Sequence, residues 1–254
     1  MMMDRMRTYK VEGMVIKHRD WGEADRIITV YTRETGKLRV IAKGAKKIHS
    51  RKAGHLEPFT HVVIQLDRSS DMPIISQVET IDPYFTLRDD LTTLSLGLFI
   101  LELMDRFTKE EEGEDIPLFN LLRDSIKRLE QDADKWLVVA TFEMKLLDSL
   151  GFRPQFFQCV NCNKPVQPVD QFFSPMEGGV ICPDCANKKM GLWPIAVEPL
   201  RFFRHFQRSN YADSIKANVT LEIRKQMDVL IQDYLSFLLE KNLNTPRFIN
   251  SVNS

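Results

Sequence analysis

The chain has 254 residues, enough for one large domain or two smaller ones, and its apolar share of 43% can supply a packed core. The net charge is zero, but residues 1–81 carry fifteen Lys and Arg against ten Asp and Glu, a balance of +5. Residues 82–254 carry twenty against twenty-five, a balance of −5. This asymmetry indicates that the first part of the chain meets a polyanion and that the second part does other work.

The sequence argues against a membrane-spanning or exported protein. The most apolar run, residues 94–104, is too short to cross a bilayer and contains Glu102. The N-terminal residues lack the apolar core that a signal peptide needs. We therefore expect a protein of the reducing cytoplasm, in which the four cysteines need a role other than structural disulfides.

Short strands are predicted throughout the first eighty residues. Alternating apolar residues, separated by turn signals such as Trp21-Gly22 and Thr35-Gly36, indicate strands at residues 11–17, 27–32, 38–42, 62–66 and 74–78. So many short strands in this length favour a small closed barrel, because closure removes exposed sheet edges. An OB-fold barrel fits best, and an SH3-like barrel is the competing interpretation.

Helical periodicity replaces the strand pattern after Asp82-Pro83. Apolar stripes predict helices at residues 89–104, 117–130, 136–150, 198–207 and 221–240. Gly151 follows the third of these helices as a C-terminal cap, and Pro154 prevents its resumption. Residues 109–115 (KEEEGED) are expected to be a solvated acidic connection.

The most cationic part of the chain is residues 37–52, KLRVIAKGAKKIHSRK, which no Asp or Glu interrupts. Its first half alternates like a strand, and its Gly- and Lys-rich second half is typical of a loop. A cationic strand that leads into a cationic loop is the pattern of a phosphate-binding surface. From composition alone, a charged loop that contacts only solvent is an equal alternative.

All four cysteines form one pattern. Cys159 and Cys162 make one CxxC pair, Cys182 and Cys185 make another, and nineteen residues lie between the pairs. This spacing predicts a zinc ribbon in which each pair supplies two thiolates to one tetrahedral zinc ion. Four sulfur ligands leave no coordination position for water or substrate, so the zinc is expected to be structural. A redox or disulfide role is the alternative.

The sequence offers no catalytic motif. It has no HExxH, GxSxG, Walker A loop or GxGxxG after a strand, and we expect no catalytic residue and no enzyme activity. Glu23 and Asp25 beside Arg26 are expected to fix a turn through charge-assisted bonds rather than to perform acid–base chemistry.

Several motifs occur together along the chain: residues 14–26, 32–45, 50–51, 56–59, 102–103, 142–147 and 150–154, and the two CxxC pairs around Gly178-Gly179. In combination they resemble the bacterial recombination mediator RecO family. The resemblance covers nearly the whole chain, thins after Leu200 and is specific only as a combination. Some members of the family lack the cysteines, so this chain resembles the metal-bearing subset.

The resemblance implies an α+β multidomain chain with three parts. These are an N-terminal OB-fold β-barrel for DNA binding at residues 1–81, an α-helical domain at residues 82–254, and a zinc ribbon inserted at residues 157–188. RecO-like proteins bind single- and double-stranded DNA, anneal complementary strands and act in DNA repair and recombination. They work with RecR, and with RecF in some settings, to load RecA onto DNA coated by single-strand-binding protein, whose acidic C-terminal tail they contact.

We therefore expect a cytoplasmic, nucleoid-associated, non-enzymatic mediator of DNA repair. The candidate DNA-binding residues are Arg26, Lys37, Arg39, Lys43, Lys46, Lys47, Arg51 and Lys52. For Arg26, Glu23 or Asp25 is an alternative partner to a phosphate. Four aromatic residues could stack on bases or equally belong to the barrel core: Tyr9, Trp21, Tyr31 and Phe59.

Two other functions stay open. The first is a zinc-ribbon interaction scaffold whose contact with nucleic acid is incidental. The second is a metal-dependent nuclease or hydrolase, which a saturated four-cysteine site and the lack of an open carboxylate cluster disfavour.

Overall fold

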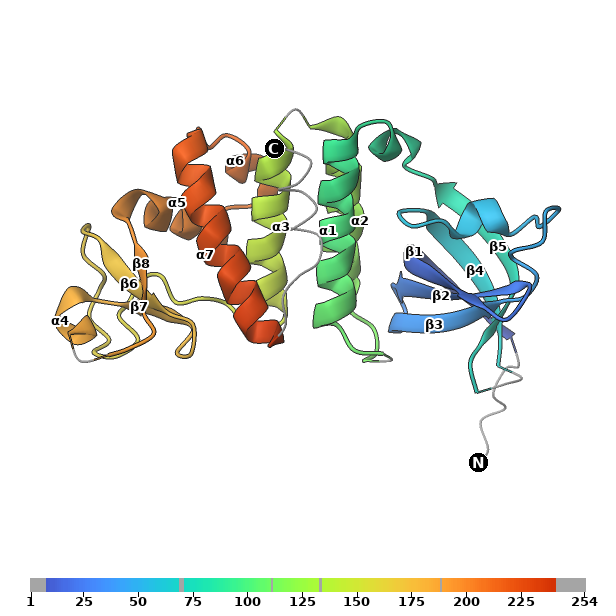
Figure 1. Ribbon diagram of the computed structural model, residues 1–254, viewed down its shortest axis with the longest axis horizontal. Helices are drawn as coiled ribbons and strands as arrows, with labels where there is room; N and C mark the ends of the chain where they lie inside the picture. The colour runs from blue at the N-terminus through green and yellow to red at the C-terminus, as the bar shows by residue number, and fades with distance from the viewer. Residues whose placement is uncertain (1–7, 69–70, 111, 133, 188, 241–254) are drawn as a thin grey trace. The chain divides into compact units, whose positions relative to one another are not determined.

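The computed structural model describes residues 8–68, 71–110, 112–132, 134–187 and 189–240. These residues form two compact units, which divide between Lys135 and Trp136. Figure 1 shows the elements of both units along the chain.

The first unit begins with a closed barrel of five strands in the order β1-β2-β3-β5-β4. All neighbours are antiparallel except β3 and β5, which are parallel and meet at Ile41 and Ile74. The strands extend the five predicted segments and confirm each of them: β1 Thr8–Trp21, β2 Asp25–Thr32, β3 Gly36–Ala42, β4 His61–Asp67 and β5 Ile74–Asp82.

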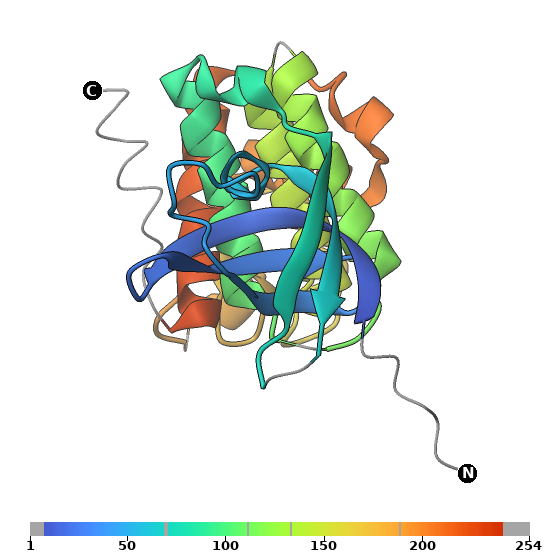
Figure 2. The same ribbon diagram turned by 90° about the vertical axis from the view of Figure 1, so that its right-hand side faces the viewer.

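The long strand β1 closes the barrel by pairing with β4 through its first half and with β2 through its second half. A register shift between Val15 and Lys17 lets the strand bend, and Figure 2 shows its curved path (dark blue). Gly13 lies where the strand crosses β2, and a Cβ there would come within 2.4 Å of Val30. Alternate residues of all five strands point inward and form the barrel core, including Val15, Ile28, Val40, Ile64 and Ile75.

Two 3-10 turns and two helices complete the first unit. The turns are Ala53–Leu56 and Phe85–Arg88, and the helices are α1 Leu91–Phe107 and α2 Ile116–Gln131, side by side in Figure 1. Both helices begin at an aspartate whose carboxylate accepts a backbone N–H of the first turn: Asp90 accepts from Thr93 and Asp115 from Leu118. Gly97 of α1 leaves room for the ring of Phe59, which a Cβ would approach to 2.8 Å.

The second unit contains helices and a small sheet. The predicted helices are confirmed as α3 Lys135–Ser149, α5 Val197–Arg208 and α7 Leu221–Leu239, and α5 and α7 contact each other. The sheet has the order β7-β6-β8, with β6 Gln171–Ser174, β7 Gly179–Ile181 and β8 Trp193–Ile195. The sequence analysis did not predict strand β8 or the short helices α4 Pro183–Ala186 and α6 Tyr211–Ser214.

Candidate nucleic-acid interface and metal centre

The cationic residues 37–52 occupy strand β3 and the loop that follows it. This loop is fastened to the turn between β1 and β2. The Lys46 N–H donates to the Ala24 carbonyl at 2.9 Å, and the Gly44 N–H donates to Asp25 Oδ1 at 2.7 Å. Gly44 has φ +68°, a conformation that glycine adopts without strain. The loop therefore has a defined position beside the turn.

Lys43, Lys47 and Arg51 lie in this loop with exposed side chains. Within the part of the chain that the structure describes, no carboxylate forms an ion pair with any of them. Three such cations on one loop are available to anions from solvent. We call Lys43, Lys47 and Arg51 the open cations.

Two other predicted DNA-binding residues form hydrogen bonds within the first unit. Lys37 is only 8% exposed, and its ammonium donates to the Asp105 carbonyl at 2.5 Å and lies 3.6 Å from Asp105 Oδ1. The Lys52 ammonium donates to the Ile75 carbonyl at 2.6 Å, and burial lowers its pKa. Both ammonium groups therefore contact backbone carbonyls of the first unit.

The remaining three predicted cations have acidic partners. Arg39 Nε lies 2.6 Å from Glu110 Oε1 in the acidic connection between α1 and α2, so part of this connection, predicted to be solvated, packs on strand β3. Lys46 Nζ lies 3.0 Å from Asp20 Oδ2, and its hydrogen bond lowers the pKa of Asp20. Such exposed pairs are weak and can exchange for a phosphate.

Arg26 is paired differently from the sequence prediction. Its Nη1 donates to Glu57 Oε1 at 3.1 Å, and its Nε lies 3.5 Å from Asp20 Oδ1, rather than near Glu23 or Asp25. Asp25 does fix the turn, as expected, but through the backbone of Gly44.

The aromatic candidates separate into core and surface. Tyr31 is 3% exposed and Phe59 is 2% exposed, so both belong to the core. The half-buried Tyr9 lies under the guanidinium of Arg68, with Cζ 4.2 Å from the ring centroid. Trp21 is 53% exposed.

The structure brings the four cysteines together, with every pair of sulfur atoms within 4.8 Å. The Sγ atoms of Cys162 and Cys182 lie 3.9 Å apart. A tetrahedron with zinc–sulfur bonds of about 2.3 Å has edges of about 3.8 Å, so the cluster can hold a metal ion with little adjustment. Asn163 follows the first pair with φ +59° and donates its N–H to the Cys159 carbonyl at 2.8 Å, which closes the first knuckle.

The polar groups around Cys159 favour its thiolate. Burial opposes ionisation, but backbone N–H groups of Cys182, Cys162 and Asn161 point at its sulfur, and together they lower the pKa of Cys159 to about 6. Burial raises the pKa of Cys182 to about 12. A bound metal cation would offset the effect of burial and lower the pKa of the Cys182 thiol, because metal coordination deprotonates thiols.

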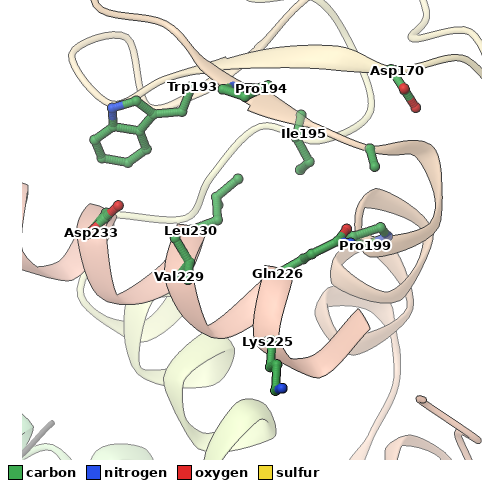
Figure 3. A pocket seen from close by; sticks show the side chains of 11 residues that line it. Asp170, Trp193, Pro194, Ile195, Pro199, Lys225, Gln226, Val229, Leu230 and Asp233 are labelled. Atoms are coloured by element: carbon green, nitrogen blue, oxygen red, sulfur yellow. The ribbon is translucent and has the colours of Figure 1, made fainter. Parts of the chain in front are cut away.

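A separate pocket of about 590 Å³ lies in the second unit, between β8, the start of α5, and α7 (Figure 3). Its lining is mostly apolar, with Trp193, Ile195 and Leu230 among the side chains in view. The carboxylate of Asp170 accepts the Val197 N–H at 3.0 Å and so supports the start of α5. The lining residues do not pair a nucleophile with a general base.

Comparison with known proteins assigns the chain to a family. The sequence model described as "Recombination protein O N terminal" matches residues 6–84, and "Recombination protein O C terminal" matches residues 88–247. The chain belongs to the RecO family. A protein named "DNA repair protein RecO" from Roseiflexus sp. (strain RS-1) is 34% identical over 248 residues, which cover 98% of this chain and 87% of the relative.

Two further RecO relatives are similar along nearly their whole length. The "DNA repair protein RecO" of Bacillus pumilus (strain SAFR-032) is 33% identical over 250 residues, covering 96% of this chain and 94% of the relative. The protein of the same name from Desulforamulus reducens is 31% identical over 247 residues, covering 97% and 96%. No helix among the described residues is long and apolar enough to cross a membrane.

Proposed function

We propose that this chain is a non-enzymatic mediator of DNA repair and homologous recombination that binds DNA without sequence specificity. The observation that carries this proposal is the loop with the open cations, Lys43, Lys47 and Arg51, beside a closed barrel in a chain of the RecO family. Cations on an exposed loop contact phosphates, which are present at every sequence. The strand order supports an OB-fold assignment for the barrel.

The same loop can promote annealing. Two complementary strands repel each other through their phosphates, and cations that neutralise both backbones lower this repulsion. The chain would then bind both single strands and duplex DNA.

The proposed partners follow from the family. They are RecR, the acidic C-terminal tail of the single-strand-binding protein, RecF and the RecA recombinase, which the chain would help to load onto coated DNA in the cytoplasm at the nucleoid. The family matches meet between residues 84 and 88, which supports a DNA-binding domain at residues 1–81 and a helical domain at 82–254.

The cysteine cluster is proposed to bind one structural Zn²⁺ within a ribbon at residues 157–188. Cys159, Cys162, Cys182 and Cys185 would supply all four ligands. The ion would stabilise the short strands around it and would take no part in chemistry.

The test is charge reversal of the open cations. The triple substitution Lys43→Glu, Lys47→Glu and Arg51→Glu should abolish binding to a labelled oligonucleotide in low salt and slow the annealing of complementary strands. Lys216→Glu in the second unit, an exposed residue paired with Asp213, is the matched control and should bind DNA as the wild type does.

An interaction scaffold with incidental DNA contact is the second candidate, because the second unit carries an apolar pocket of about 590 Å³. If the triple variant lost DNA binding but supported repair in cells as the wild type does, the scaffold would be the better account.

A further inference from the structure

Trp21 is the last residue of strand β1 and lies at the turn into β2. Its side chain is 53% exposed, whereas the aromatic residues Tyr31 and Phe59 of the same barrel are at most 3% exposed. Gly22 follows with φ +61°, and a Cβ added at this glycine would meet no atom within 4 Å beyond its chain neighbours, so the turn is open to solvent. Tryptophan is usually well buried, and at exposed positions it is enriched in binding surfaces.

The neighbours of Trp21 connect it to the cationic loop. Lys46 of that loop reaches the turn and lies 3.0 Å from the carboxylate of Asp20, the residue before Trp21. The guanidinium carbon of Arg19 lies 5.8 Å from the centroid of the Trp21 ring. An exposed aromatic face, a planar cation and the cationic loop therefore share one end of the barrel.

The surface between the turn that follows Trp21 and the cationic loop is hollowed. A depression of about 560 Å³ lies between the turn and the cationic loop, and its lining includes Glu23, Lys46, Lys47 and Ile48. Ile48 is 97% exposed, which adds an apolar side chain next to the cations.

We propose that the indole of Trp21 stacks on an unpaired base of a nucleic acid whose phosphates contact the open cations. This inference rests on the proposed function and adds the class of substrate that the interface prefers. In a duplex both faces of each base are covered by neighbouring bases, and a protein ring stacks there only after the duplex is unstacked. Trp21 should therefore favour single strands, while the open cations bind both forms.

The turn is a suitable place for such a contact. In barrels of this strand order, the loop between the first two strands borders the face that binds oligonucleotides. A protein partner of Trp21 is the alternative, but the adjacent cations and the extended cationic loop favour a polyanion that also presents aromatic rings.

The experiment compares the full-length wild type with Trp21→Ala and Trp21→Phe on an oligothymidine and on a blunt duplex of the same length. Trp21→Ala should weaken binding to the single strand by about fivefold to a hundredfold, because base–aromatic stacking has about this value per base. Its affinity for the duplex should be unchanged, and Trp21→Phe, which keeps an aromatic ring, should retain most of the single-strand affinity.

Fluorescence gives an independent readout. The chain has three tryptophans, and oligothymidine should quench the emission of the wild type more than that of Trp21→Phe. Equal loss of affinity for both DNA forms, or equal quenching in both proteins, would overturn the stacking contact. If the wild type bound both DNA forms and Trp21→Ala bound them with the same affinities, only this inference would be overturned. If the wild type bound neither DNA form, the proposed function would be overturned as well.

Discussion

The contact between Glu110 and Arg39 predicts that an acid of this chain competes with DNA. Glu110 Oε1 lies 2.6 Å from Arg39 Nε, and both side chains are partly exposed, at 41% and 45%. Glu110 also forms an isolated β-bridge with Lys37, which places its backbone beside strand β3. In the free protein, this carboxylate occupies the position that a phosphate would need at Arg39.

Replacement of Glu110 by Gln should release Arg39. Each phosphate contact steepens the dependence of log affinity on log salt by about 0.7 for a single strand. Relative to about 1 M salt, one added phosphate contact raises the logarithm of the binding constant by about 0.7 at about 0.1 M salt. This is about a fivefold gain in affinity. We expect Glu110→Gln to approach this gain, because the exposed ion pair contributes little stability of its own.

The assay is fluorescence anisotropy of a labelled oligothymidine over a salt series. Glu114→Gln, an exposed acid of the same connection, is the matched control, since it removes an equal charge without releasing Arg39. The double substitution Arg39→Ala and Glu110→Gln should show no gain. If Glu110→Gln and Glu114→Gln behaved alike, Arg39 would not be a latent phosphate contact.

Three further results are expected. Serine at both Cys159 and Cys162 should remove one zinc per chain in metal analysis and lower the melting temperature; a metal-free wild type that melts unchanged would contradict this. Burial raises the pKa of Asp228 to about 6, so its contribution to stability is present below about pH 4 and is lost as the pH rises through about 6. Asp228→Asn keeps an oxygen acceptor for the Trp136 N–H, which donates to Asp228 Oδ1 at 2.8 Å. This substitution should stabilise the protein by up to roughly 3 kcal/mol more at neutral pH than at about pH 4. Equal changes in thermal stability at both pH values would refute the raised pKa of Asp228. Lys37→Met should lower the melting temperature but leave the salt dependence of DNA binding unchanged, and a flatter slope would show that Lys37 reaches DNA.

Local patterns were sufficient to predict the five barrel strands, the long helices and the cysteine cluster. Alternation with period two gave the barrel strands, and the spacing of the CxxC pairs anticipated four sulfur atoms within 4.8 Å. Strand β8 was missed because Trp193-Pro194-Ile195 is too short for a pattern and becomes a strand only by pairing with β6.

Which cations are free could not be predicted, because their partners are distant in sequence. Asp105, which binds Lys37, is 68 positions away, and no local pattern indicates that contact. The pairing of Arg39 with Glu110 depends equally on how α1 returns the chain to strand β3. A run of basic residues shows where positive charge is concentrated, and only the packing shows that Lys43, Lys47 and Arg51 stay open.

The most direct measurement is the affinity of the unmodified protein for an oligothymidine as salt is raised from about 50 to about 200 mM. Three phosphate contacts by the open cations predict a slope of about −2 and a loss of affinity of about 20-fold over this range. A protein that did not bind even in the most dilute buffer, or whose affinity did not change with salt, would contradict the account.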